Sequence, residues 1–208
     1  GTSNTAGTFN FTVSATDGVN AVTRAFSIVV VAPVFMSATG GTITTDGDYK
    51  VHTFTADANF VVSEVGTDST YGTKVEYLIV AGGGGGGHSG HGGGGGAGGY
   101  RHNSAYDQTV SAATYAVVVG DYGASKTAGG VSSAFSLTSA GGGQGGNPGS
   151  HAGQAGGSGG GGCGHPSTGG GGAGNTPSTS PSQGNSGGHG GGSSAPIYGS
   201  GGGSGAGG

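Results

Sequence analysis

The chain has 208 residues, of which 58 are glycine, and only 31% of its residues are hydrophobic. Charged residues make up 7% of the chain, where about 25% is usual, so the composition argues against an enzyme with an ordinary packed core. A net charge of −4 with five lysines and arginines argues against nucleic-acid binding through clustered cations. Every apolar stretch, such as residues 77–81, is far shorter than the roughly 20 residues that cross a bilayer, so we expect no membrane insertion.

Glycine and charge are distributed unevenly along the chain. Eight of the 58 glycines lie in residues 1–80 and the other 50 lie in residues 81–208. From residue 127 to the end there is no Asp, Glu, Lys or Arg. The single cysteine, Cys163, excludes an intrachain disulfide framework. The sequence therefore predicts a β-forming part followed by a glycine-rich part.

The first predicted elements are two strands. Residues 9–15 alternate between apolar and polar side chains, which is the period of a half-buried strand. Asp17 and Gly18 then favour a turn, and residues 22–31 return as the antiparallel partner. Because an isolated hairpin buries too little apolar surface to persist, we expect further strands of this module to precede Gly1.

The motif AGTFNFTVSATD at residues 6–17, with Gly1 and Thr2 before it, identifies a first resemblance. It resembles the closing strands of the immunoglobulin-like and cadherin-like repeats of bacterial and phage surface proteins. The resemblance implies that residues 1–32 are the end of a spacer module without catalytic function.

The next stretch predicts several short strands. Residues 41–81 carry apolar side chains between turn signals at residues 46–47 and 57–59, and residues 75–80 form the most apolar strand. Two later runs, residues 115–119 and 131–137, show the same alternation. We expect a small β-sandwich base at residues 33–80, completed by strands near 110–120 and 131–138. No window keeps the period of a helix, so the predicted class is all-β without α-helix.

Residues 81–208 contain glycine blocks separated by short polar connectors, and two interpretations remain open. A flexible linker is typical of such composition, because it has little apolar area to offset the entropy of ordering. The alternative is a bundle of polyglycine-II helices, with three residues per turn and all backbone hydrogen bonds made to neighbours. The strands that return within this part, and the even size of the blocks, favour the bundle.

Five motifs carry a second resemblance: YKVHTFT (49–55), VEYLIVA (75–81), GGGGGAGGYR (92–101), YAVVVG (115–120) and SSAF (132–135). Together they resemble the glycine-rich domain of bacteriophage tail-fibre and related adhesin proteins, over about residues 41–208. The resemblance implies a β-rich base that carries a sandwich of polyglycine-II helices at residues 81–208. It also implies that the variable connecting loops touch the bacterial receptor.

The connectors supply the candidate receptor-binding residues. Aromatic, guanidinium and amide groups between a glycine block and a strand suit recognition of a glycan or a protein loop. The other interpretation is a solvated loop whose tyrosines cover the base. The candidates are Tyr100, Arg101, His102, Asn103, Tyr106, Asn147, His151, His165 and Tyr198.

No motif predicts catalysis, a cofactor or a metal site. Glycine patterns that imitate a dinucleotide fingerprint lack the helix that such a site needs. His88, His91, Cys163 and His165 could be assembled into a zinc site, but their spacing is loose and surface loops are the favoured interpretation. Asp46 and Asp48 are better explained as a turn than as calcium ligands, since further oxygen ligands do not follow.

The second resemblance implies an extracellular virion protein, the receptor-binding tip of a phage tail fibre. Its expected partners are a bacterial outer-membrane protein or glycan and other fibre or virion subunits. The alternative is a purely structural component of a virion or an extracellular filament, which spaces or decorates without specific binding. Ice binding is a third hypothesis, which the lack of regular threonine arrays disfavours.

Overall fold

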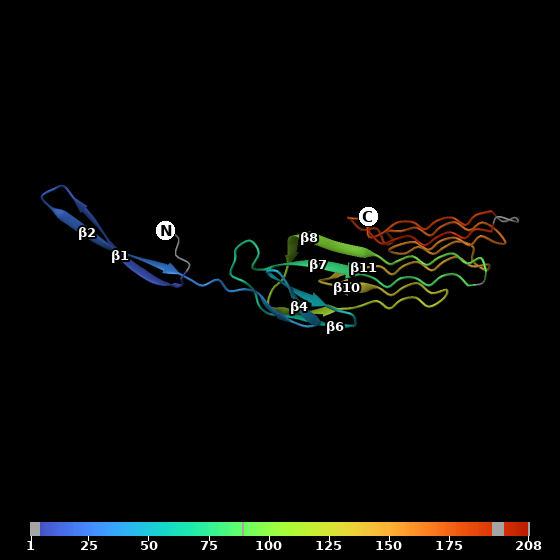
Figure 1. Cartoon of the computed structure of the whole chain (residues 1–208), viewed down its shortest axis with the longest axis horizontal. Coiled ribbons are helices and arrows are strands. Elements are labelled where there is room, and N and C mark those ends of the chain that lie inside the picture. Colours follow the sequence, from blue (N-terminus) through green and yellow to red (C-terminus); the bar gives the residue numbers. More distant parts are fainter. Residues whose placement is uncertain (1–4, 89, 193–197, 208) are drawn as a thin grey trace.

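A computed structural model describes residues 5–88, 90–192 and 198–207. Figure 1 shows a hairpin at one end, a group of short strands in the middle, and long glycine-rich segments at the other end. No helix occurs among the described residues, so the all-β prediction is confirmed. Gly1 and Thr2, part of the first resemblance, lie outside the described residues.

The predicted hairpin is formed by β1 (Gly7–Thr16) and β2 (Ala21–Val30), which pair in register from Gly7 with Val30 to Thr16 with Ala21. The Asp17 carboxylate closes the turn, because its Oδ1 accepts the backbone N–H groups of Asn20 at 2.7 Å and Val19 at 2.9 Å. These bonds favour the charged form and hold the pKa of Asp17 below its usual value.

The apolar face of this hairpin is not covered by any described segment. Phe11 and Phe26 stack on each other at 5.6 Å, yet they are 44% and 42% exposed. Both strands of the predicted hairpin are thus present, and the expectation that further strands of this module precede Gly1 stays a prediction. Two strands alone supply cross-strand contacts on one face, but no second layer.

The base contains nine strands in four small sheets. They are β3 (Ser37–Thr39), β4 (Thr42–Asp46), β5 (Tyr49–Thr53), β6 (Ala58–Glu64), β7 (Lys74–Val80), β8 (Tyr100–Thr109), β9 (Ala113–Val117), β10 (Ser132–Ala134) and β11 (Leu137–Ser139). β6 lies between β3 and β9, while β4 pairs with β5, β7 with β8, and β10 with β11. The boundaries predicted for the three parts of the chain stay predictions.

The core of the base gathers strands that are distant in sequence. Phe60, Val62 and Val110 are buried at its centre. The ring of Phe60 lies 6.4 Å from Tyr115 and 6.0 Å from Phe135, so the later strands pack on the same core as the earlier ones. This packing anchors the segments that follow each strand.

The strand region predicted near residues 131–138 is a hairpin of two short strands, β10 and β11. Phe135 and Ser136 have φ angles of 53° and 63°, and they join β10 to β11 as a two-residue turn. Positive φ at both central positions is typical of type I′ turns, which usually contain Asn and Gly. Hydrophobic packing of the Phe135 ring favours this turn despite its sequence.

Beyond residue 80, the glycine-rich segments are joined by lateral backbone hydrogen bonds that repeat every three residues. The N–H groups of Ala81, Gly84 and Gly87 donate to Gly99, Gly96 and Gly93 at 3.0, 2.7 and 2.9 Å. The register is antiparallel, because each step of three residues forward in one segment is three residues backward in the other. An extended β ladder would repeat every two residues.

Residues 81–87 also form backbone hydrogen bonds with a second neighbouring segment, residues 123–130. Gly82 and Gly85 donate to Gly130 and Thr127, while the carbonyl groups of Gly83 and Gly86 accept from Gly123 and Lys126. Among the described glycines after residue 80, only Gly98 and Gly207 have a positive φ. Backbone groups on several sides of one segment are thus paired without help from side chains.

The glycine-rich run at residues 153–164 reverses direction within itself. Gly160 donates to Gln154 and Cys163 donates to His151, which is an antiparallel register. The hydroxyl group of Ser158, which is fully buried, donates to Gly98 at 2.6 Å and to Gly205 at 3.0 Å. The chain direction therefore reverses near Ser158, and the glycine-rich composition of this run does not predict that reversal.

Replacing a packed glycine is predicted to disrupt the segments. An added Cβ on buried Gly161 would lie 2.0 Å from the carbonyl oxygen of Gly201, whereas nothing lies within 4 Å of one on Gly202. We expect Gly161→Ala to destabilise the protein by about 1–3 kcal/mol through overpacking, measured by thermal unfolding. Gly202→Ala is the matched control, expected to be neutral or slightly stabilising. Equal effects of the two substitutions would contradict this packing.

Candidate binding surfaces

The connectors between glycine segments lie at two opposite ends. At the end away from the base, Gly164 N–H donates to the carbonyl group of His91, and Cys163 N–H donates to that of His151. These bonds bring together the connectors at residues 90–91, 147–151 and 165–168, which Figure 1 shows at the far end of the segments. We call this end the distal tip. Residues 175–185 lie instead at the base, where Gln183 accepts from Tyr100 N–H at 2.8 Å.

Three rings gather at the distal tip. The ring centroids of His91 and His165 are 5.0 Å apart, and Tyr198 lies 5.2 Å from the first and 4.9 Å from the second. The Ser200 hydroxyl donates to the His91 carbonyl group at 2.8 Å, and the Cys163 thiol donates to that of His165 at 2.9 Å. Two imidazoles and a phenol thus form one aromatic cluster that also carries hydrogen-bonding groups.

The structure brings together His165 and Tyr198 from the predicted set and adds His91. The sequence presented His91 only as a loose zinc ligand. The sequence signal for this position is that His91 and residues 165–168 each follow a glycine block that runs away from the base. No group of three or more His, Cys, Asp or Glu side chains arranged for a metal ion occurs among the described residues.

Two other predicted residues of the distal tip support its turns. The side chain of Asn147, only 8% exposed, accepts the N–H groups of Gly149 at 3.0 Å and Ser150 at 3.3 Å. His151 is half-buried, and its Nε2 atom is buried without a hydrogen-bond partner. Asn147 therefore stabilises its own connector, because its oxygen is already occupied.

The remaining candidates lie on the base. Tyr100, Arg101, His102, Asn103 and Tyr106 belong to β8, so the predicted connector is a strand paired with β7. The Arg101 guanidinium donates to the carbonyl group of Thr138 at 3.2 Å, and the rings of Tyr100 and His102 lie 5.1 Å apart. The structure thus separates the predicted site residues into a base group and a distal group.

Tyr106 lines a hollow of about 420 Å³ together with Asp48, Tyr49 and Tyr71. Its ring stacks on Tyr49 at 6.4 Å and meets Tyr71 edge to face at 5.5 Å. A hydrogen bond with the Tyr49 hydroxyl, with a contribution from the charge of Glu76, raises the pKa of Tyr106 to about 12. Sequence reasoning missed Tyr49 and Tyr71 as possible site residues.

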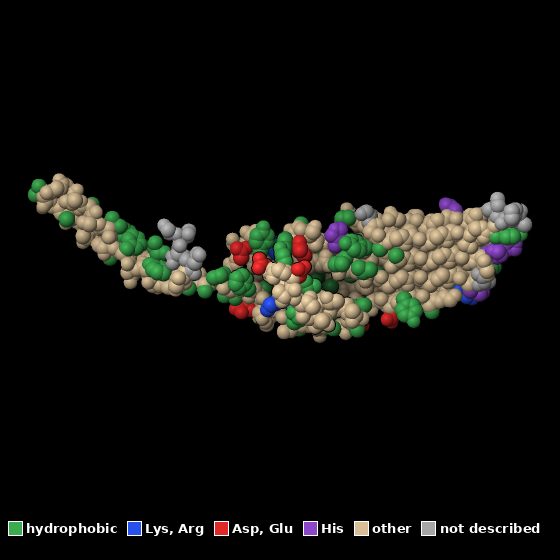
Figure 2. Space-filling view, viewed as in Figure 1, with side chains coloured by type: hydrophobic (Ala, Val, Ile, Leu, Met, Phe, Trp, Pro, Cys, Tyr) green, Lys and Arg blue, Asp and Glu red, His purple; other side chains and the backbone are tan. Residues whose placement is uncertain are grey.

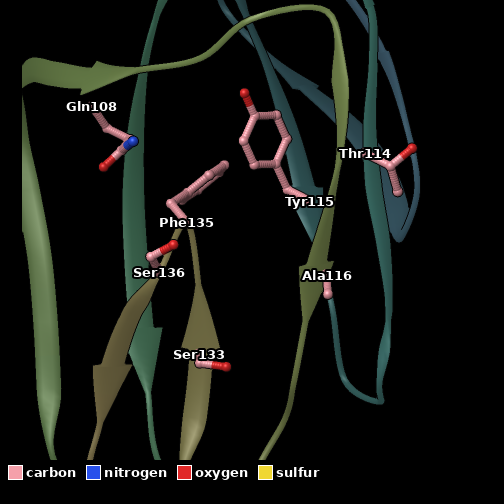
Figure 3. A pocket seen from close by; sticks show the side chains of 7 residues that line it. All are labelled: Gln108, Thr114, Tyr115, Ala116, Ser133, Phe135 and Ser136. Carbon is pink, nitrogen blue, oxygen red and sulfur yellow. The ribbon is translucent and has the colours of Figure 1, made fainter.

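A second hollow, of about 410 Å³, lies between β9 and the turn that joins β10 to β11. In Figure 3 the Phe135 ring lies between the Tyr115 ring and the Gln108 amide. Both rings also pack against Phe60 in the core, and the Tyr115 hydroxyl accepts the Ser111 N–H at 2.8 Å. These contacts explain the two aromatic side chains as parts of the base.

Asp46 and Asp48 flank Gly47, whose φ is 56°, in the tight connection from β4 to β5. This position is the predicted turn. Across the segments that the structure describes, no helix is long and apolar enough to span a membrane.

Comparison with known proteins gives one family. The profile described as "Glycine-rich domain" matches residues 62–208, more than half of the chain, so the chain belongs to the glycine-rich domain family. The search of curated proteins found no match, and the search of solved structures found none either. The glycine-rich part of the sequence resemblance is thereby shown.

The ring cluster at the distal tip generates a spectroscopic prediction. Because Tyr198 lies against both imidazoles, Tyr198→Ala should shift the ring-proton resonances of His91 and His165 while leaving those of the exposed His189 unchanged. Tyr122→Ala, at a side chain that is 83% exposed, is the control and should shift neither imidazole. Unchanged His91 and His165 resonances in Tyr198→Ala would contradict the cluster.

Proposed function

We propose that this member of the glycine-rich domain family is the receptor-binding tip of a phage tail fibre, in which a polyglycine-II bundle presents loops to a bacterial surface receptor. The observation that carries the proposal is the aromatic cluster of His91, His165 and Tyr198, held at the end of the bundle that lies away from the base. The residues of this cluster come from three connectors that are distant in sequence.

The hydrogen-bond pattern supports polyglycine-II helices. A repeat of three residues is the repeat of the polyproline-II conformation, which makes no hydrogen bonds within itself. Gly93, Gly96 and Gly99 donate to Gly146, Gly143 and Ala140 at 2.8, 2.9 and 2.8 Å, again in steps of three. Because interior segments such as residues 81–87 and 93–99 are paired on several sides, the bundle can act as a stiff arm between base and tip.

The surface of the bundle supports presentation rather than binding along its length. In Figure 2 its visible face consists almost entirely of backbone and uncharged side chains, and coloured side chains lie mainly near its ends. Residues 127–208 contain no acidic or basic residue apart from histidine. Tyrosine and histidine at the distal tip supply ring area and hydrogen bonds, as at the energetic centres of many interfaces.

The partner in this proposal is an outer-membrane protein or a glycan of the host cell, and the base end joins the tip to other fibre or virion subunits. The proposed location is accordingly extracellular, on the virion. A purely structural fibre component is the competing function. The hairpin β1–β2 favours this competing function, because the repeats that it resembles serve as spacers.

A cell-binding assay separates the two functions. Labelled protein is incubated with a panel of Gram-negative strains, and bound protein is measured before and after protease or periodate treatment of the cells. Replacing His91, His165 and Tyr198 together by alanine should lower binding at least about tenfold on a strain that the unmodified protein binds. The control is His189→Ala, an exposed histidine outside the cluster, which should bind normally.

Either of two results contradicts the proposal: no strain binds the unmodified protein, or the triple variant binds as well as the control. Loss of binding after protease treatment indicates a protein receptor, and loss after periodate treatment indicates a glycan. The same assay with Tyr100, Arg101 and Tyr106 replaced by alanine tests the base group separately.

A further inference from the structure

A bulge in β8 controls the position of Tyr106. Val75 pairs with Gln108 and Tyr77 pairs with Asn103, so Glu76 alone lies opposite the four residues 104–107. An insertion of this kind leaves residues unpaired and turns their side chains in new directions. Tyr106 lies within this bulge.

The bulge places a large side chain in a rare backbone conformation. Tyr106 has a φ of 47°, in the left-handed region, where a bulky residue is uncommon. The Asn103 side chain holds the bulge, since its oxygen accepts the Tyr77 N–H at 3.3 Å and its nitrogen donates to Asp107. Such conformations concentrate at functional sites, where the surrounding structure maintains them.

Packing in the core does not explain this arrangement. The core cluster is centred on Phe60, Val62 and Val110, and Tyr106 is not among the side chains packed against it. Its ring contacts Tyr49 and Tyr71 instead, which are 56% and 60% exposed. A bulge with a left-handed tyrosine thus completes an exposed aromatic hollow.

The chemistry of the hollow favours a sugar ring. The planes of the Tyr49 and Tyr106 rings are within 20° of each other, while Tyr71 stands at 68° to Tyr106. Flat aromatic faces pack against apolar C–H groups. Phenol hydroxyls donate hydrogen bonds to ligand hydroxyls and accept them, while a carboxylate accepts them. The volume of about 420 Å³ lies within the usual range for small-ligand sites.

We propose that Tyr49, Tyr71 and Tyr106 bind a neutral saccharide, whose ring packs on the tyrosines and whose hydroxyl groups donate to the Asp48 carboxylate. The residues that line the hollow include one acid, Asp48, and no lysine or arginine, so binding of an anionic sugar is disfavoured. The site lies on the base, distant from the distal tip, and goes beyond the receptor-binding function proposed for that tip.

Titration of the 208-residue chain by intrinsic fluorescence tests this site, because the protein has eight tyrosines and no tryptophan. The probes are N-acetylglucosamine, lactose and its anionic counterpart 3′-sialyllactose. At least one neutral probe should give a saturable change with a dissociation constant on the order of millimolar, and sialyllactose should bind more weakly than lactose.

Variants locate the response. Tyr71→Ala removes an exposed ring and should weaken binding of the neutral probe about tenfold without changing the thermal unfolding midpoint. Tyr122→Ala is the matched control, since its side chain is exposed and does not line the hollow, and it should bind as the unmodified chain does. The distal triple variant at His91, His165 and Tyr198 should also bind normally, which separates this site from the tip.

Three results overturn the proposal. None of the neutral probes changes the fluorescence, or Tyr71→Ala binds as tightly as Tyr122→Ala. The third is saturable binding of tetramethylammonium, used as a further probe, with no response to any saccharide, which would identify the hollow as an aromatic cage for an organic cation.

Discussion

Backbone-to-backbone contact without side chains is the constraint on which the glycine-rich half of this protein depends. A Cβ on Gly85 would lie 1.8 Å from the carbonyl oxygen of Ala124, and one on Gly203 would lie the same distance from that of Gly95. Only residues without a Cβ allow segments to approach so closely and to pair N–H and C=O groups sideways. Hydrogen bonds with a net value of about 0.5–1.5 kcal/mol each must offset the entropy of ordering glycine, so many segments must pack together.

The base supplies a hydrophobic core, which the glycine-rich bundle lacks. Its aromatic core fixes the positions from which the segments leave, and Gln183 connects the two parts, since its side-chain oxygen accepts the Ala140 N–H at 2.8 Å while its carbonyl group accepts that of Tyr100. The far connectors then meet at a place fixed by segment length. The three rings at the distal tip follow from this geometry and not from any local sequence motif.

Sequence reasoning predicted much of the fold, because strands of period two and the turn at Asp17 are local signals. It missed features that depend on contacts between distant segments. The turn at Phe135 exists because its ring packs on the core, and the bulge that carries Tyr106 has no glycine or proline to mark it. Placing each connector at the base or at the tip also required the reversal at Ser158, which lies inside a run rich in glycine.

Amide hydrogen exchange across residues 81–207 tests the central claim most directly. The account predicts slow exchange for the N–H groups of interior glycines such as Gly96 and Gly161, which donate to Gly143 and Gly94 at 2.9 and 2.8 Å. Glycines in the connectors should exchange quickly. Complete exchange of the interior glycines at the earliest time points would contradict the account, because it would mean that the blocks are a flexible linker.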